Sequence, residues 1–127
     1  MASKAGTAEF EFDSLPLFDE EACAEFADLM ADDFQKLSNN FLIDIDRAVN
    51  QIQQLPAERV AEMAELAHKY KSAAGYLGAT RLRGLLEQIE IKAREGDFSG
   101  CQPFIELAAK VASETLAALK HYINRSR

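Results

Sequence analysis

A histidine and a lysine three residues apart are the side chains of this sequence that are best suited to chemistry. His68 and Lys71 lie in the stretch from Ala64 to Ala79, AELAHKYKSAAGYLGA. Neutral imidazole has a free lone pair near neutral pH, and covalent capture of a phosphoryl group by histidine is a form of nucleophilic catalysis. A lysine one helical turn away can neutralise phosphoryl oxygens as a mobile point charge. The pair therefore indicates a site at which a histidine accepts a phosphoryl group.

The apolar residues around His68 predict a helix that turns the histidine outward. Six of them share one side at about 100° per residue: Val60, Met63, Ala67, Tyr70, Ala74 and Leu77. His68 lies roughly 130° from the centre of this stripe. Its neighbours one and two turns away are all small: Ala61, Ala64, Ser72 and Gly75. An exposed imidazole among small side chains leaves room for a second protein to approach.

Other kinds of site have less support. A di-metal site in a helical bundle needs two Glu-x-x-His pairs; Glu65 precedes His68 at that spacing, but His121 is preceded by Ala118. No serine or cysteine lies one turn from a histidine with a third group to orient it, and no glycine-rich nucleotide loop is present. We therefore predict no metal ligands in this chain, and we interpret His121 as a surface histidine near a helix end.

Length and composition indicate a single soluble domain. The chain has 127 residues and two cysteines, Cys23 and Cys101, without the spacing of a metal site. We expect both thiols to be reduced and at least half-buried. No apolar run approaches the roughly 18 residues of a membrane span, and residues 1–7 lack the apolar centre of a signal peptide. These features predict a cytoplasmic protein with no membrane partner.

Charge is unevenly distributed along the chain. The net charge is −7, and residues 1–46 contain twelve acidic and two basic side chains. Such acidity argues against a nucleic-acid partner, whose phosphates would be repelled. The locally basic part surrounds His68 and contains Lys69, Lys71, Arg81 and Arg83.

Hydrophobic periodicity predicts an all-α fold, an up-and-down antiparallel four-helix bundle with a short additional N-terminal helix. The expected helices run from Asp19, as a cap, to about Met30, and over about 32–54, 57–77, 80–95 and 103–124. We expect Thr80 to cap the fourth of these helices and Pro103 to begin the last. Gly78 and Gly96 are the expected terminators of the two preceding helices.

The first 18 residues form an N-terminal extension that we expect to be partly disordered. Residues 1–8 are small and polar, whereas residues 9–18 alternate acids with large apolar side chains. The apolar part either lies extended across the end of the bundle or serves as a docking peptide for a partner.

The residues around His68 resemble a known family. The run from His68 to Ser72, HKYKS, followed by Gly78-Ala79 and then Leu82, looks like the histidine-containing phosphotransfer (HPt) domain, whose signature is H-x-x-K-G with a second glycine six residues later. The resemblance covers nearly the whole chain, because residues 18–22, FDEEA, look like the short first helix of the family and residues 34–55 like its second. It implies an HPt four-helix-bundle domain over residues 19–127.

By this resemblance His68 is the phosphorylated residue, Lys71 steadies the phosphoryl group and Gly78 is the closing glycine. Family members often have a polar side chain on the next helix near the imidazole, and either Gln88 or Glu90 could orient the ring in this way. Ser72 departs from the family, which usually has glycine there. That departure puts partner choice and transfer rate in doubt.

The resemblance implies a phosphorelay intermediate of two-component signal transduction. The phosphoryl group would pass between His68 and aspartates of response-regulator receiver domains, one of them possessed by a hybrid sensor histidine kinase. We expect a monomeric phosphocarrier that is not an enzyme and has no cofactor; the partner binds Mg²⁺, because this chain lacks a carboxylate cluster for it. Partner docking is expected at Ala61, Ala64, Lys69, Ser72, Gly75 and Gly78. The alternative is a helical-bundle adaptor that binds and inhibits a receiver or kinase domain without being phosphorylated.

Overall fold

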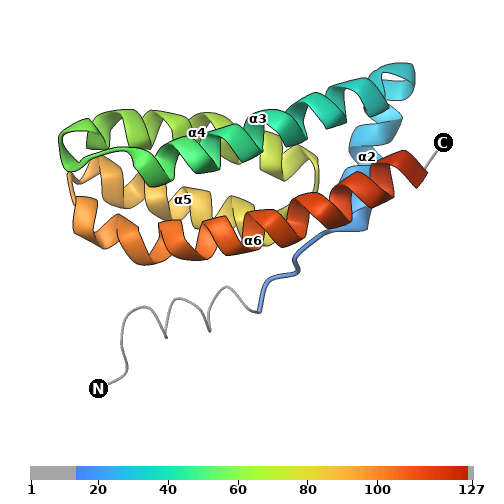
Figure 1. Cartoon of the computed structure of the whole chain (residues 1–127). Helices are drawn as coiled ribbons and strands as arrows, with labels where there is room; N and C mark the ends of the chain where they lie inside the picture. Colours follow the sequence, from blue (N-terminus) through green and yellow to red (C-terminus); the bar gives the residue numbers. More distant parts are fainter. Residues whose placement is uncertain (1–13, 126–127) are drawn as a thin grey trace.

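Four long helices form an antiparallel bundle, and a shorter helix crosses one of its ends (Figure 1). The computed structural model describes residues 14–125. The bundle helices are α3 (Phe34–Gln54), α4 (Val60–Tyr76), α5 (Thr80–Arg94) and α6 (Phe98–Arg125), and the shorter helix is α2 (Glu20–Met30). Two single 3-10 turns, Ala31–Asp33 and Ala57–Arg59, lead into α3 and α4. The predicted all-α fold class is confirmed.

The bundle is held together by apolar side chains from all four long helices. The largest fully buried ones are Ile45 and Ile52 of α3, Met63 of α4, Leu77 beyond it, Leu82, Leu85, Leu86 and Ile89 of α5, and Leu119 and Ile123 of α6. Burying each such side chain contributes roughly 1.5–3 kcal/mol. This packing fixes α4 against α5, the two helices that provide the chemistry described below.

Helix α2 is attached to the bundle through its first residues and one aromatic side chain. Asp19 caps the helix, since its Oδ1 accepts a hydrogen bond from the Ala22 amide at 3.2 Å. The Asp19 amide donates to the Gly78 carbonyl at 2.7 Å. Phe26 is buried and its ring stacks on Tyr76, with centroids 5.4 Å apart. Helix α2 therefore covers the end of the bundle at which the α4–α5 turn lies (Figure 1).

The described part of the N-terminal extension packs against the same end. Leu15, Leu17 and Phe18 are partly buried against the core. The Arg81 side chain donates to the Leu15 carbonyl from Nε at 3.0 Å and from Nη2 at 2.7 Å. From residue 14 onward, the segment that we predicted to lie across the end of the bundle therefore packs there. The expected disorder of residues 1–8, and residues 9–13 of the apolar segment, lie outside the described residues.

One predicted helix start and one predicted helix cap are wrong. Helix α6 begins at Phe98, and Pro103 lies inside it; Asp97 is what begins the helix, because its Oδ1 accepts from the Gly100 amide at 2.9 Å in the manner of an N-cap. Thr80 is the first residue of α5 and not its cap. Its hydroxyl instead reaches the Gly78 carbonyl at 3.4 Å.

Gly78 and Gly96 end α4 and α5 as predicted, both with positive φ, +80° and +75°. Their surroundings differ. A Cβ on Gly78 would lie 2.2 Å from the Asp19 carbonyl oxygen, whereas a Cβ on Gly96 would meet nothing within 4 Å. The two glycines therefore separate the cost of a left-handed backbone from the cost of a steric clash.

We predict that Gly78→Ala destabilises the protein more than Gly96→Ala. Both variants place a side chain in the left-handed region, at roughly 1–2 kcal/mol, but only Gly78→Ala must also displace α2, at roughly 1–3 kcal/mol more. Urea denaturation followed by circular dichroism measures both values. Equal losses would show that the contact of Gly78 with Asp19 is not a constraint.

Candidate site around His68

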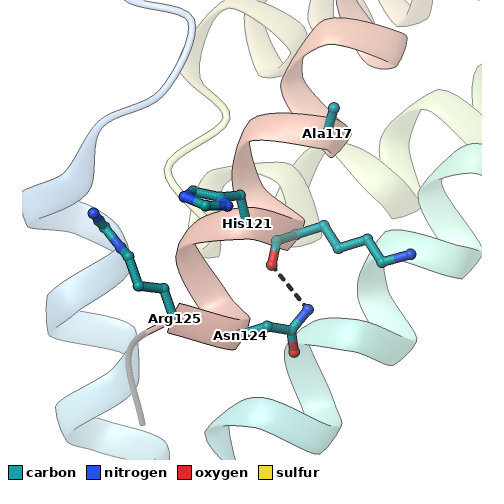
Figure 2. Close-up of a pocket in the computed structure, with 5 residues that line it drawn as sticks. Ala117, His121, Asn124 and Arg125 are labelled. Carbon is teal, nitrogen blue, oxygen red and sulfur yellow. Dashed lines mark hydrogen bonds between the residues drawn. The ribbon is translucent and has the colours of Figure 1, made fainter.

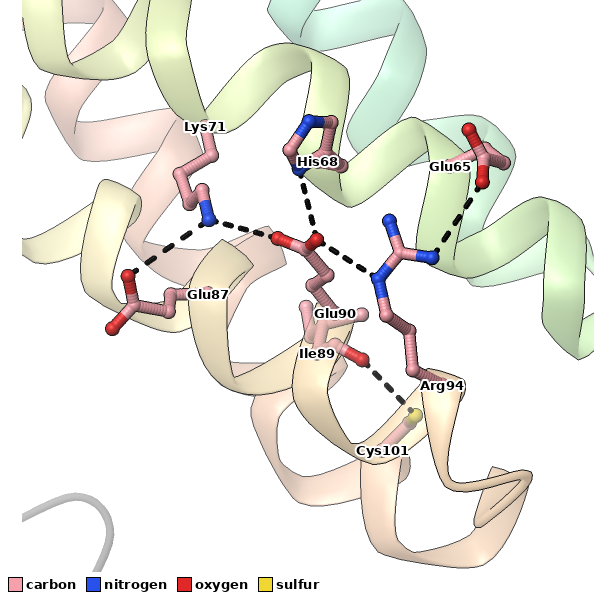
Figure 3. A network of polar contacts seen from close by, with 8 residues as sticks. All are labelled: Glu65, His68, Lys71, Glu87, Ile89, Glu90, Arg94 and Cys101. Atoms are coloured by element: carbon pink, nitrogen blue, oxygen red, sulfur yellow. Dashed lines mark hydrogen bonds and ion pairs between the residues drawn. The ribbon is translucent and has the colours of Figure 1, made fainter.

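His68 lies in the middle of α4 with its imidazole open to solvent, and 59% of the side chain is exposed. Val60, Met63, Ala67, Tyr70, Ala74 and Leu77 face the core or are packed against it, so the predicted orientation of the helix is right. The ring leans towards α5 on the edge of the exposed side (Figure 3). A partner can therefore approach the histidine without any movement of this chain.

Glu90 of α5 binds the inner nitrogen of the imidazole. Its Oε2 lies 2.9 Å from His68 Nδ1. An ionised carboxylate can only accept hydrogen bonds, so Nδ1 must carry a proton. In the neutral ring the lone pair is then on Nε2, the nitrogen turned away from Glu90 (Figure 3). The contact fixes both the orientation of the ring and the tautomer that has its nucleophilic atom outside.

Lys71 binds the other oxygen of the same carboxylate. Its Nζ donates to Glu90 Oε1 at 2.8 Å and lies 3.9 Å from Glu87 Oε1. Only 20% of the lysine side chain is exposed, so Lys71 leans towards α5 rather than across the outward face. Its ammonium group has three donors, and one of them can reach towards a group on His68 while Glu90 keeps another.

Arg94 completes the cluster, and the sequence analysis did not single it out. Its Nε donates to Glu90 Oε2 at 3.0 Å, one turn along α5, and its Nη1 lies 3.6 Å from Glu65 Oε2 on α4. The i,i+4 spacing of Glu90 and Arg94 was the available signal. Its relevance to His68 depends on how α4 and α5 pack, which the spacing alone does not give.

Hydrogen bonds from three side chains keep Glu90 ionised although it is only 8% exposed. Burial by itself raises the pKa of this carboxyl, but hydrogen bonds from Lys71, Arg94 and His68, with the charge of Lys71, outweigh it and lower the pKa from 4.5 to about 2. The carboxylate is therefore negative throughout the physiological range.

Of the two candidates for orienting the imidazole, Glu90 makes the contact. Gln88 lies two residues earlier on α5, about 200° around the helix, and so points to a different side. The sequence left this choice open because it does not define the rotation of α5 about its own axis.

The six residues expected to form the docking surface are exposed to different extents. Ala61, Lys69 and Ser72 are exposed, and Gly75 is half-buried. Ala64 is 2% exposed and Gly78 is buried under the Asp19 backbone, so the expectation that these two offer docking surface is wrong. Helices α3 and α5 pack on both sides of α4, and they cover a wider arc than its apolar stripe alone suggests.

The two cysteines and the second histidine offer no comparable site in the described chain. Cys23 and Cys101 are free and buried, as predicted; burial, with the charges of Glu20 and Asp97 respectively, raises the pKa of each thiol to about 11. His121 lies in a shallow hollow formed by side chains of α6 alone (Figure 2). Within residues 14–125, no three His, Cys, Asp or Glu side chains are grouped closely enough to hold a metal ion. Nor is any helix in that range long and apolar enough to cross a membrane.

We predict that Glu90 contributes to stability in a pH-dependent manner. Its pKa is lower in the folded protein than the ordinary 4.5, so the contribution is complete above about pH 4.5 and is lost as the pH falls towards 2. Glu90→Gln should be less stable than the natural protein at pH 7, by up to about 3 kcal/mol, and the difference should shrink by more than half at pH 3.

Urea denaturation at the two pH values tests this, with Glu87→Gln as the matched control on the same helix. The Glu87 side chain is 44% exposed, so its variant should differ little from the natural protein at either pH. If the loss in free energy of unfolding caused by Glu90→Gln were the same at pH 7 and pH 3, Glu90 would not have a lowered pKa in the folded protein.

Comparisons with known proteins identify the family and agree with the helical-bundle fold. The model of the Hpt domain family matches residues 21–127. The fold is similar to the crystal structure of histidine-containing phosphotransfer protein B (HptB) from Pseudomonas aeruginosa PAO1, with a TM-score of 0.80 and 23% sequence identity over 90% of this chain and 100% of that one. No curated protein matches the chain in the corresponding sequence comparison. Since the family model covers most of the sequence, the chain belongs to the Hpt domain family.

Proposed function

We propose that this protein is a phosphorelay intermediate that carries a phosphoryl group on His68 Nε2. The group arrives from the aspartyl phosphate of one receiver domain, for example that of a hybrid sensor histidine kinase, and leaves to the aspartate of another. The protein acts as a monomeric phosphocarrier in the cytoplasm. It is a substrate of the transfer rather than an enzyme that performs it.

The observation that carries the proposal is the bond between His68 Nδ1 and Glu90 Oε2 in an otherwise exposed ring. In the transfer, the Nε2 lone pair attacks phosphorus, the Nε2–P bond forms, and the P–O bond to the receiver aspartate breaks to release its carboxylate. Positive charge develops on the imidazole as Nε2 is substituted while Nδ1 keeps its proton. The ionised Glu90 stabilises that charge through the hydrogen bond already in place.

The surroundings of His68 fit an acidic partner. Lys69 is exposed on the turn that bears His68, and the Arg83 side chain lies across Gly75 two turns further on, with Nε 3.2 Å from where a Cβ would be. A receiver brings a carboxylate cluster and Mg²⁺ to the transfer, and basic residues at the rim speed encounter with such a surface. We assign Mg²⁺ to the partner and no cofactor to this chain.

The direct test is transfer of labelled phosphate from a phosphorylated receiver in the presence of Mg²⁺. The natural protein should gain an acid-labile, alkali-stable label, and His68→Gln should gain none. His121→Gln removes the other histidine of the chain and should be labelled normally. Because His68 is exposed, its variant should retain its helicity and lose less than about 1 kcal/mol of stability.

The same experiment decides between a carrier and an adaptor. A protein that binds the receiver but acquires no label would be an adaptor that blocks its partner without being phosphorylated. Label that persists in His68→Gln and disappears in His121→Gln would show that the acceptor is His121 of α6. Either result would end the proposal.

We further predict that Lys69 and Lys71, the two lysines that follow His68, act in different ways. Lys71→Met should lower the maximal transfer rate by roughly 10- to 100-fold, since it removes a charge close to the transferring group. Lys69→Met should instead raise the receiver concentration needed for half-maximal rate, because an exposed rim charge acts on encounter. Rates measured over a range of receiver concentrations separate the two effects, and identical behaviour of both variants would contradict the separate roles.

A further inference from the structure

One oxygen of Glu90 is shared between the imidazole and a guanidinium group. Glu90 Oε2 accepts from His68 Nδ1 at 2.9 Å and from Arg94 Nε at 3.0 Å. Arg94 also extends to Glu65, three residues before His68 on α4. The guanidinium therefore lies close to the imidazole, on the other side of the carboxylate from Lys71 (Figure 3).

The charged groups that face His68 come from both packed helices. On α4 they are Glu65 and Lys71, and on α5 they are Glu87, Glu90 and Arg94; Lys69, the residue after His68 on α4, has its Nζ 5.4 Å from the centre of the Tyr70 ring instead. A carboxylate hydrogen-bonded to Nδ1 favours the protonated imidazolium when nothing offsets its charge. The imidazolium has protons on both nitrogens and so no lone pair for attack. A cation near Glu90 reduces this preference for the imidazolium and so favours the form that can attack.

We propose that Arg94 is a positioning residue for His68: it holds Glu90 Oε2 beneath the imidazole and offsets the carboxylate charge, which favours the ring form that has its lone pair on Nε2 over the imidazolium. Lys71 holds the other carboxylate oxygen, at 2.8 Å, so the two cations fix Glu90 from opposite ends. Arg94 makes no contact with the transferring group. The role rests on the proposed phosphotransfer at His68, but its effect on the ring exists in the unphosphorylated protein.

The test compares three variants of the full chain by NMR of the imidazole ¹⁵N signals during a pH titration. Arg94→Met removes the guanidinium. Arg94→Lys retains a positive charge. Lys92→Met removes the other basic residue of the last turn of α5, about 200° around the helix, and so matches the loss of charge at the helix end without touching Glu90.

The expected result is that half-protonation of His68 moves to higher pH by roughly half a unit in Arg94→Met. In Lys92→Met the displacement should be at most about a fifth as large. In Arg94→Lys the pH of half-protonation should return towards the natural value. No displacement in Arg94→Met, an equal displacement in Lys92→Met, or an Arg94→Lys variant as displaced as Arg94→Met would each overturn the proposal. A denaturation curve on each variant establishes that the fold is intact.

Transfer kinetics provide a second readout that a purely structural role would not change. Arg94→Met should accept phosphate about two- to threefold more slowly than the natural protein at pH 6.5, and the deficit should disappear or reverse at pH 8.5, because a carboxylate that is less offset also stabilises the charge that develops on the ring. A deficit that is equal at both pH values would mean that Arg94 acts only through structure. If the natural protein takes no label at all, the phosphotransfer proposal fails, whereas the NMR titration still decides the role of Arg94.

Discussion

The site depends on one carboxylate that stays ionised between two packed helices. Glu90 is nearly buried, and it is stable there because Lys71, Arg94 and His68 together direct three N–H groups at its two oxygens. Removing either of the two cations leaves the cost of burying this charge less fully offset. The register of α4 against α5 is therefore tied to the same contacts that orient the imidazole.

This arrangement explains how an exposed histidine can have a fixed geometry. Solvent-exposed side chains ordinarily sample several rotamers, and a ring held only by packing would need to be buried. Here Glu90 holds His68 from below through Nδ1, while the outer edge of the ring remains free for a partner. Glu90 is fixed by the packing of α4 against α5, and its hydrogen bond to Nδ1 in turn fixes the orientation of the ring.

Most of the fold could be predicted from sequence because its signals are local. Apolar periodicity, the Asp19 cap and the two terminating glycines each act within a few residues, and they gave the helices and the outward direction of His68. Pro103 misled, because a proline inside a helix and one at its start look alike until the Asp97 cap is considered.

What could not be predicted depends on contacts between helices. The burial of Ala64, the choice of Glu90 over Gln88, and the position of Arg94 all follow from the rotation of α4 and α5 about their axes. Helical periodicity places residues relative to one another on a single helix, but it does not say which neighbour covers each side. The chemistry-bearing residues on α4 were therefore identifiable, whereas on α5 the choice between Gln88 and Glu90 stayed open and Arg94 was missed.

The junction between α2 and the bundle has a consequence for how this sequence can diverge. The Asp19 amide bonds the Gly78 carbonyl, and the Asp19 carbonyl occupies the space beside the Gly78 Cα. Main-chain atoms make this contact on both sides, so position 19 can exchange among capping residues such as serine or asparagine without disturbing it. Of the two positions in this contact, only position 78 is then restricted in evolution. We expect a glycine to be kept there in related sequences whose α2 residues differ.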